Sequence, residues 1–224
     1  NYIPQIAQQI YERYTKKNDI VLDLFFGSGT SGIEAINMGR RCIGVELKDE
    51  LAESVSEKFT PKQLVTDVNI ICADSASEIA KEKIKARLDI MGAKKAQLLM
   101  LHPPYDDIIK FSDNINDLSN SHTLNEFLDS FGMVIDNTTK YLEKNRYCAC
   151  VIGDKYANSQ VIPLGFYCMN QFLERGFLLK AILVKNFGET KGKSNQQGIW
   201  RYRAITNDFY IFKHEYIFIF KKVK

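Results

Sequence analysis

The stretch Ile20-Val-Leu-Asp-Leu-Phe-Phe-Gly-Ser-Gly-Thr-Ser-Gly32 decides the fold. Residues 20–26 form an apolar run interrupted by Asp23, which is typical of a strand buried on both faces of a parallel sheet. The glycines that follow permit a tight turn and a close approach of the backbone to a ligand. The helix expected after them offers free N–H groups. The sequence therefore predicts a strand, a ligand-binding loop and a helix in succession.

A carboxylate marks the end of the next expected strand. Arg41-Cys-Ile-Gly-Val45 runs into Glu46, and a carboxylate about twenty residues beyond such a loop is suited to binding a ribose diol. The glycines and Glu46 alone also fit the dinucleotide fingerprint of nicotinamide-dependent oxidoreductases. These two features therefore predict a nucleotide-like ligand without naming it.

A further motif, His102-Pro103-Pro104-Tyr105, directly follows the apolar run 96–101. Two consecutive prolines lack N–H donors and fix φ near about −65°, so they end a strand abruptly and hold the chain extended. The motif thereby presents a polar side chain, a carbonyl and an aromatic ring at the carboxyl edge of the sheet, where open α/β sheets bind their ligands. Such a group suits the binding of a planar ring that carries an amino group.

Strand-like and helix-like stretches alternate along the chain, which indicates a mainly parallel sheet covered on both faces. Strands are expected near 20–25, 41–46, 69–72, 96–101 and 146–152, and helices over 3–14, 123–143 and 162–175. The last two β-rich runs, 177–185 and 210–221, have no helical stretch between them. They are therefore expected to pair as an antiparallel hairpin.

Composition sets the class of protein. A length of 224 residues fits a single domain, 1–224, and the hydrophobic content of 45% and charged content of 25% are ordinary for a globular protein. The net charge of +3 permits nucleic acid as a partner without requiring it. No membrane span, signal peptide or zinc-like cysteine spacing is visible, so we expect a cytoplasmic protein with reduced thiols and no metal. The first residue is Asn, which suggests a chain trimmed at its start.

Together, these motifs resemble those of the S-adenosylmethionine-dependent DNA methyltransferases that modify exocyclic amines, either adenine N6 or cytosine N4. In that family the corresponding segments are the cofactor loop, the ribose-binding strand end, the strand whose acidic residue meets the cofactor adenine, an Asp/Asn/Ser-Pro-Pro-aromatic motif and the closing strand. In this chain the five segments are, in the same order, Asp23–Thr30, Val45-Glu46, Asn69–Ser75, His102–Tyr105 and His214–Lys221. The resemblance therefore covers nearly the whole chain. The chain departs from the pattern in having His at the first position of the fourth segment.

The resemblance implies a Rossmann-like methyltransferase fold: a mainly parallel seven-stranded sheet with an antiparallel C-terminal hairpin and helices on both faces. It implies S-adenosylmethionine as the cofactor, DNA as the partner and a role in DNA modification, with restriction-modification as one setting. The implied catalytic residues are His102, Pro103, Pro104 and Tyr105, and the implied cofactor-binding residues are Asp23, Phe25, Phe26, Gly27, Gly29, Thr30, Glu46 and Asp74. For Asp23 the resemblance implies a hydrogen bond to the glycine loop or to the cofactor's amino group. Alternatives remain for five of these residues: His102 as a strand-end cap, Tyr105 as a packing aromatic, Asp23 as an ordinary strand-end acid, Phe26 as a core residue, and Asp74 as part of a helix cap.

The chemistry implied for His102 is hydrogen-bond acceptance. An exocyclic amine is a poor nucleophile, and hydrogen bonds from its two N–H groups to His102 and to the Pro103 carbonyl would free its lone pair, while Tyr105 stacks on the base. Only the neutral imidazole accepts a hydrogen bond, so turnover is expected to fall as the pH drops through the pKa of His102, whose unperturbed value is about 6.5. The expected substrate is a flipped-out DNA base.

Adenine N6 is preferred as the target because Pro-Pro-Tyr resembles the adenine enzymes. The alternatives are cytosine N4, an RNA or protein amide, a nicotinamide-dependent oxidoreductase and a DNA-binding subunit without activity. No separate target-recognition domain is visible, so sequence recognition is expected to use the long stretches 106–122 and 186–208, a second subunit, or a part missing from this chain. Within the second stretch the predicted DNA-binding residues are Lys191, Lys193, Trp200, Arg201 and Arg203.

Overall fold

The computed structural model describes residues 2–59, 67–105, 112–114, 116–157, 159–186, 197–206, 208–211 and 213–223. Helices and strands alternate through most of these ranges. In chain order the elements are α1 (Pro4–Tyr14), β1 (Ile20–Asp23), α2 (Thr30–Asn37), β2 (Arg41–Glu46), α3 (Asp49–Lys58), β3 (Val68–Cys72), α4 (Glu78–Ile90), β4 (Ala96–Leu101), the 3₁₀ turn η2 (Leu118–Asn120), α5 (Leu124–Thr139), β5 (Leu142–Ile152), β6 (Lys155–Ala157), β7 (Gln160–Ile162), α6 (Leu164–Glu174), β8 (Leu178–Asn186), α7 (Gln197–Thr206) and β9 (His214–Lys221).

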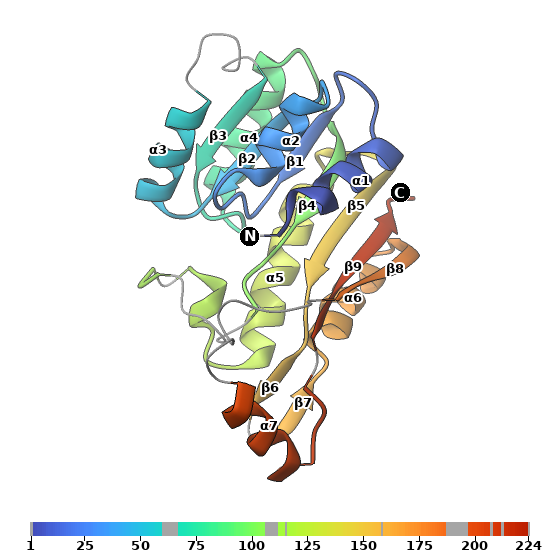
Figure 1. Cartoon of the computed structure of the whole chain (residues 1–224). Helices are drawn as coiled ribbons and strands as arrows, with labels where there is room; N and C mark the ends of the chain where they lie inside the picture. The colour runs from blue at the N-terminus through green and yellow to red at the C-terminus, as the bar shows by residue number, and fades with distance from the viewer. Residues whose placement is uncertain are drawn as a thin grey trace.

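Seven strands form one sheet in the order β3-β2-β1-β4-β5-β9-β8. The five strands from β3 to β5 are parallel, whereas β9 runs antiparallel to both β5 and β8 (Figure 1). The predicted antiparallel hairpin is thus confirmed, as is the Rossmann-like sheet. Because β1 to β4 are parallel, their carboxyl ends meet at one edge, and this edge carries every strand-end motif of the sequence.

Helices cover both faces of the sheet. On one face α4, α5 and α6 bury a core that includes Phe127, Phe131 and Phe172. On the other face α1, α2 and α3 pack through side chains such as Tyr11 and Val55. The central strands β1 and β4 are buried on both faces, which explains why their sequences are almost continuously apolar.

The chain between β8 and β9 differs from the expectation. The sequence predicts a long loop over 186–208, but the structure places helix α7 at Gln197–Thr206. A short hairpin, β6–β7, also follows β5 and was not expected. Figure 1 shows both lying beyond the carboxyl end of β5, and Tyr156 of the hairpin stacks on Phe209, at 3.8 Å between ring centroids.

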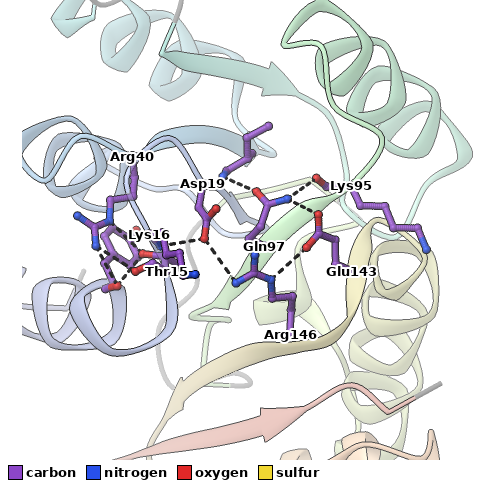
Figure 2. Close-up of polar contacts among 10 residues, drawn as sticks. Thr15, Lys16, Asp19, Arg40, Lys95, Gln97, Glu143 and Arg146 are labelled. Atoms are coloured by element: carbon purple, nitrogen blue, oxygen red, sulfur yellow. Dashed lines mark hydrogen bonds and ion pairs between the residues drawn. The ribbon is translucent and has the colours of Figure 1, made fainter.

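The opposite edge of the sheet is held by a polar network (Figure 2). The Gln97 side chain accepts a hydrogen bond from the Ile20 backbone N–H at 2.7 Å and donates one to Glu143 at 2.6 Å. Arg146 then links Glu143, at 3.0 Å, to Asp19, at 3.6 Å. These contacts tie the amino ends of β1, β4 and β5 together, so the edge away from the strand-end motifs is fixed.

All five cysteines are free thiols. Four lie in the core, and burial raises their pKa where a shift is resolved, as for Cys42 and Cys148. Within the described ranges, no helix has both the length and the apolar character needed to cross a membrane.

Candidate active site

A cavity of about 570 Å³ lies at the carboxyl edge of the parallel strands. Its walls come from the loop after β1, the ends of β2, β3 and β4, the segment around η2, and one residue of β9. The lining residues are Leu24, Phe25, Gly27, Ser28, Val45, Glu46, Leu47, Lys48, Leu51, Ala73, Asp74, Ser75, His102, Pro103, Pro104, Tyr105, Asn116, Asp117, Leu118 and Glu215. A cavity of this size and apolar lining is suited to a nucleotide-sized ligand.

The glycine loop begins at Gly27, which lines the cavity and has a φ of 54°. Its N–H donates a hydrogen bond to Glu46 Oε2 at 2.8 Å, so the loop is fastened to the end of β2. Gly29 has a different role. Its φ is 86°, and a Cβ there would lie 2.8 Å from Val55 Cγ1 of α3. Gly29 is therefore required by the turn and by helix packing, and it does not line the cavity.

Phe26 and Thr30 also lie outside the cavity lining. The Phe26 ring is buried and rests on the backbone of β2, where a Cβ on Gly44 would come within 2.3 Å of it. Thr30 is the first residue of α2. Four of the residues predicted to bind the cofactor thus lie outside the cavity lining: Asp23, Phe26, Gly29 and Thr30. From this segment Leu24, Phe25, Gly27 and Ser28 line the cavity.

Asp23 is buried beneath the loop at the end of β1. One carboxylate oxygen accepts the Phe25 N–H at 3.0 Å, and the other accepts a short hydrogen bond from the Ser31 hydroxyl of α2. Burial raises the pKa of Asp23 to about 6, and the two hydrogen bonds only partly offset that rise. This geometry agrees with the implied role of Asp23 as a hydrogen-bonding support of the glycine loop.

The raised pKa makes a prediction for Asp23→Asn. Between about pH 4.5 and 7 the folded parent holds a proton that the unfolded chain releases, so the free energy of unfolding falls as the pH rises. The variant lacks this group while its amide oxygen still accepts the Phe25 N–H. We expect the stability of the variant relative to the parent to increase by about 2 kcal/mol over this range, measured by denaturant unfolding at several pH values. A difference that does not vary with pH would contradict the burial of a titrating carboxyl group.

Glu46 and Asp74 both reach the cavity. Each Glu46 oxygen accepts one backbone N–H, from Gly27 at 2.8 Å and from Lys48 at 3.1 Å. Asp74 Oδ1 accepts the Ala76 N–H at 2.8 Å, so Asp74 shapes the turn into α4 while lining the cavity. The N-cap of α4 is Ser77, whose hydroxyl accepts the Ala80 N–H, so Asp74 is not itself the helix cap. Its support of the preceding turn is geometrically compatible with binding a ligand.

The motif 102–105 forms another part of the cavity wall. The Tyr105 hydroxyl donates a hydrogen bond to Glu215 Oε2 at 2.8 Å and lies 3.4 Å from His102 Nε2. The Tyr2 ring packs edge-on against the His102 ring, at 5.4 Å between centroids. His102 is thus held from two sides.

Burial lowers the pKa of His102 to about 3, and the positive charge of Lys185 adds to the effect. The ring is therefore neutral throughout the physiological range. The predicted loss of turnover through the pKa of His102 therefore moves from the unperturbed value of about 6.5 to much lower pH, because the desolvated ring resists protonation. Burial likewise raises the pKa of Tyr105 far above its ordinary value, so its hydroxyl keeps its proton.

Several lining residues were not predicted from the sequence. Leu47, Lys48 and Leu51 follow Glu46 directly and could have been found from its position at the strand end. Asn116, Asp117 and Leu118 belong to the polar stretch after the Pro-Pro motif, which the sequence marks only as a long segment. Glu215 carries no local signal, because its contact with Tyr105 joins residues 110 positions apart.

The predicted DNA-binding residues are only partly described. Lys191 and Lys193 lie outside the described residues, as do the side chains of Trp200 and Arg203. Arg201 is exposed on α7, which also exposes Tyr202. Their predicted role in binding DNA therefore stays a prediction.

Known proteins resemble this chain at two levels. Residues 4–57 match the family model described as DNA methylase. A stretch of 54 residues, 24% of this chain, is 44% identical to the type II methyltransferase M2.LlaDCHI of Lactococcus lactis subsp. cremoris, and it spans 20% of that relative. The family-model match covers the elements from α1 through most of α3. The chain spans about a fifth of the length of the Lactococcus relative.

Solved structures match over almost the whole chain. A SAM-dependent methyltransferase from Methanosarcina mazei has a TM-score of 0.59 at 10% identity, covering 96% of this chain and 97% of that one. An rRNA methylase from Streptococcus thermophilus has a TM-score of 0.55 at 9% identity, covering 100% and 99%. At such identities these structures establish the fold. Residues 4–57 are thus similar to the DNA methylase family, and the whole chain has the Rossmann-like fold that these methyltransferase structures share.

Proposed function

We propose that this chain transfers a methyl group from S-adenosylmethionine to the exocyclic amine of a base in DNA. One observation supports the proposal above all others: the motif 102–105 lines the same cavity as Gly27, Glu46 and Asp74. A nicotinamide-dependent oxidoreductase would use the loop and Glu46 but has no need for a Pro-Pro motif beside them.

The residues of the cavity fit the proposed cofactor. A carboxylate oxygen can accept about two hydrogen bonds, so Glu46 can accept from a ribose diol while keeping its backbone partners. Val45 and Leu51 offer apolar walls for an adenine ring, and Asp74 offers an acceptor for its amino group. When bound, S-adenosylmethionine supplies an electrophilic methyl group on a sulfonium.

The target amine would be bound at the Pro-Pro motif. The His102 ring and the Pro103 carbonyl are the acceptors proposed for its two N–H groups. These hydrogen bonds favour a pyramidal nitrogen whose lone pair is available, and they stabilise the positive charge that develops on it. Within a duplex the base must first leave the stack, at a cost of a few kcal/mol. Adenine N6 is the preferred target because the motif ends in Tyr105.

The experiment is methyl transfer from labelled S-adenosylmethionine to unmethylated DNA, followed by digestion to nucleosides. We expect label in N6-methyldeoxyadenosine. Label in N4-methyldeoxycytidine would move the target to cytosine, and label only in a parallel RNA or protein sample would replace DNA as the substrate. A chain that binds a nicotinamide nucleotide but not S-adenosylmethionine would overturn the proposal.

A prediction on cofactor binding concerns Asp74→Asn. The amide oxygen can still accept the Ala76 N–H, so the turn into α4 should survive. The variant loses the negative charge and one acceptor for the adenine amino group, and hydrogen bonds to charged groups contribute about 1.5–3 kcal/mol. We expect the Kd for S-adenosylmethionine to rise about tenfold or more by calorimetry, with an unchanged Tm. An unchanged Kd would leave Asp74 only with its role in the turn that precedes α4.

Sequence recognition is proposed to use α7 together with the stretch 106–122, a second subunit or a further part of the protein. Arg201 provides the testable contact because its side chain is exposed. If it touches a phosphate, Arg201→Ala should lower the salt slope of DNA binding by about one unit. Arg13→Ala is the matched control, since Arg13 is exposed at the far end of α1, near the opposite edge of the sheet. Equal slopes in both variants would exclude Arg201 as a phosphate contact.

A further inference from the structure

A chain of polar contacts leads from the edge strand β8 to His102. Lys185 Nζ lies 2.7 Å from Glu215 Oε1, and these residues face each other in the register of β8 and β9. Glu215 Oε2 accepts the Tyr105 hydroxyl at 2.8 Å, and the Tyr105 oxygen lies 3.4 Å from His102 Nε2. The proposed base-binding histidine is thereby connected to an ion pair on the antiparallel part of the sheet.

The members of this chain are held in place by burial. Glu215 is 5% exposed, and burying a carboxylate requires a partner, which Lys185 provides. The Tyr105 ring packs over Gly153 at the end of β5, where a Cβ would lie 3.1 Å from Tyr105 Cε2. The hydroxyl of Tyr105 is therefore fixed between Glu215 and His102.

The direction of each hydrogen bond follows from the donors available. A carboxylate paired with Lys185 accepts only, so the single proton of the Tyr105 hydroxyl goes to Glu215. The Tyr105 oxygen can then interact with His102 only as an acceptor, which requires a proton on Nε2. A neutral imidazole carries one N–H, and the lowered pKa keeps the ring neutral, so Nδ1 holds the lone pair.

We propose that Lys185, Glu215 and Tyr105 act as positioning residues that hold His102 in its Nε2–H tautomer, so that Nδ1 is the acceptor for the target amine. This inference rests on the proposed function for the identity of the amine. The tautomer itself depends only on the contacts of the folded chain.

The test is a nitrogen-15 NMR spectrum of the ring nitrogens in the full chain, recorded without cofactor or DNA. The sequence has three histidines, so the signals of His102 are those that disappear in His102→Asn. In the parent we expect a protonated Nε2 and an unprotonated Nδ1. A parent with the proton on Nδ1 would overturn the proposal.

Two variants should change the tautomer, and one should not. Tyr105→Phe removes the acceptor for Nε2–H, so the Nδ1–H form should appear. In Glu215→Gln the side-chain amide can donate a hydrogen bond to the Tyr105 oxygen. The Tyr105 hydroxyl can then donate its own proton to His102 Nε2, so this variant should favour the Nδ1–H tautomer more strongly than Tyr105→Phe does. Lys185→Arg keeps the charge beside Glu215 and should retain the parent tautomer. An unchanged tautomer in both Tyr105→Phe and Glu215→Gln, each shown to be folded by thermal unfolding, would overturn the proposal.

Kinetics separates this inference from the proposed function. In Tyr105→Phe we expect kcat for methyl transfer to fall about tenfold or more, with the Kd for S-adenosylmethionine unchanged, because one hydrogen bond that orients His102 is lost. If the tautomer responds while neither parent nor variant methylates DNA, the positioning contacts stand and the proposed function fails. If the parent methylates DNA and its tautomer is insensitive to Tyr105 and Glu215, the proposed function stands and the positioning role fails.

Discussion

His102→Ala is expected to lower kcat for methyl transfer by about 10²–10³-fold and to leave the Kd for S-adenosylmethionine unchanged. The variant removes an acceptor aimed at the target amine, whereas the proposed cofactor contacts, Glu46 and Asp74, lie at the ends of β2 and β3. Labelled methyl transfer measures the first quantity and calorimetry the second. Turnover equal to that of the parent would show that His102 is only a structural residue at the end of β4.

Two variants sharpen this result. His102→Asn restores a neutral side-chain acceptor and should recover part of the lost rate, which the loss of packing alone would not predict. His122→Ala is the matched control, because His122 is exposed beside the N-cap of α5 and does not line the cavity. If His122→Ala lowers turnover as much as His102→Ala, the effect is not specific to the base-binding position.

The pH profile gives an independent check on the same residue. Because burial lowers the pKa of His102 to about 3, the accepting neutral ring persists as the pH falls. Turnover should therefore show no loss attributable to this histidine between about pH 5 and 8. An acidic limb near about pH 6.5 that disappears in His102→Asn would mean that the ring is hydrated in solution.

The fold was largely predictable because its central strands are buried on both faces. The continuous apolar runs give β2 and β4 their observed bounds, Arg41–Glu46 and Ala96–Leu101. Helix α7 was missed because Gln197–Thr206 mixes basic, aromatic and polar residues without a clear apolar period. The strands of the hairpin β6–β7 are three residues long, too short for a periodicity to be seen.

The candidate site was predictable only where chain topology determines it. Parallel strands bring their carboxyl ends together, so Glu46, Asp74 and His102 could be expected at one edge. Glu215 lies on β9, 110 residues after Tyr105, and no local sequence pattern predicts their hydrogen bond. The roles of glycines and aromatic residues near a loop are also ambiguous in the sequence. The same residue types at Phe26 and Gly29 would be found whether they contact a ligand or pack in the core.

Whether Phe26 serves the core or the cofactor can be tested at Gly44, where we expect the largest loss of stability. A Cβ at this buried position of β2 would lie 2.3 Å from Cγ and Cδ2 of Phe26, at the base of the ring, so the ring cannot turn away. Gly44→Ala should therefore lower the free energy of unfolding by about 3 kcal/mol or more. Gly198→Ala, the same substitution in the first turn of α7 with nothing within 4 Å, should be neutral or slightly stabilising.

The double variant Gly44→Ala/Phe26→Leu tests whether Phe26 is the cause. A smaller side chain leaves room for the new Cβ, so the double variant should lose less stability than the sum of the two single changes, with a coupling of about 1–3 kcal/mol in denaturant unfolding. Additive losses would place the strain elsewhere in β2. Phe26→Leu alone should bind S-adenosylmethionine with the parent's affinity, because its ring faces Gly44 and the core. A large loss of affinity in that folded variant would return Phe26 to the cofactor site.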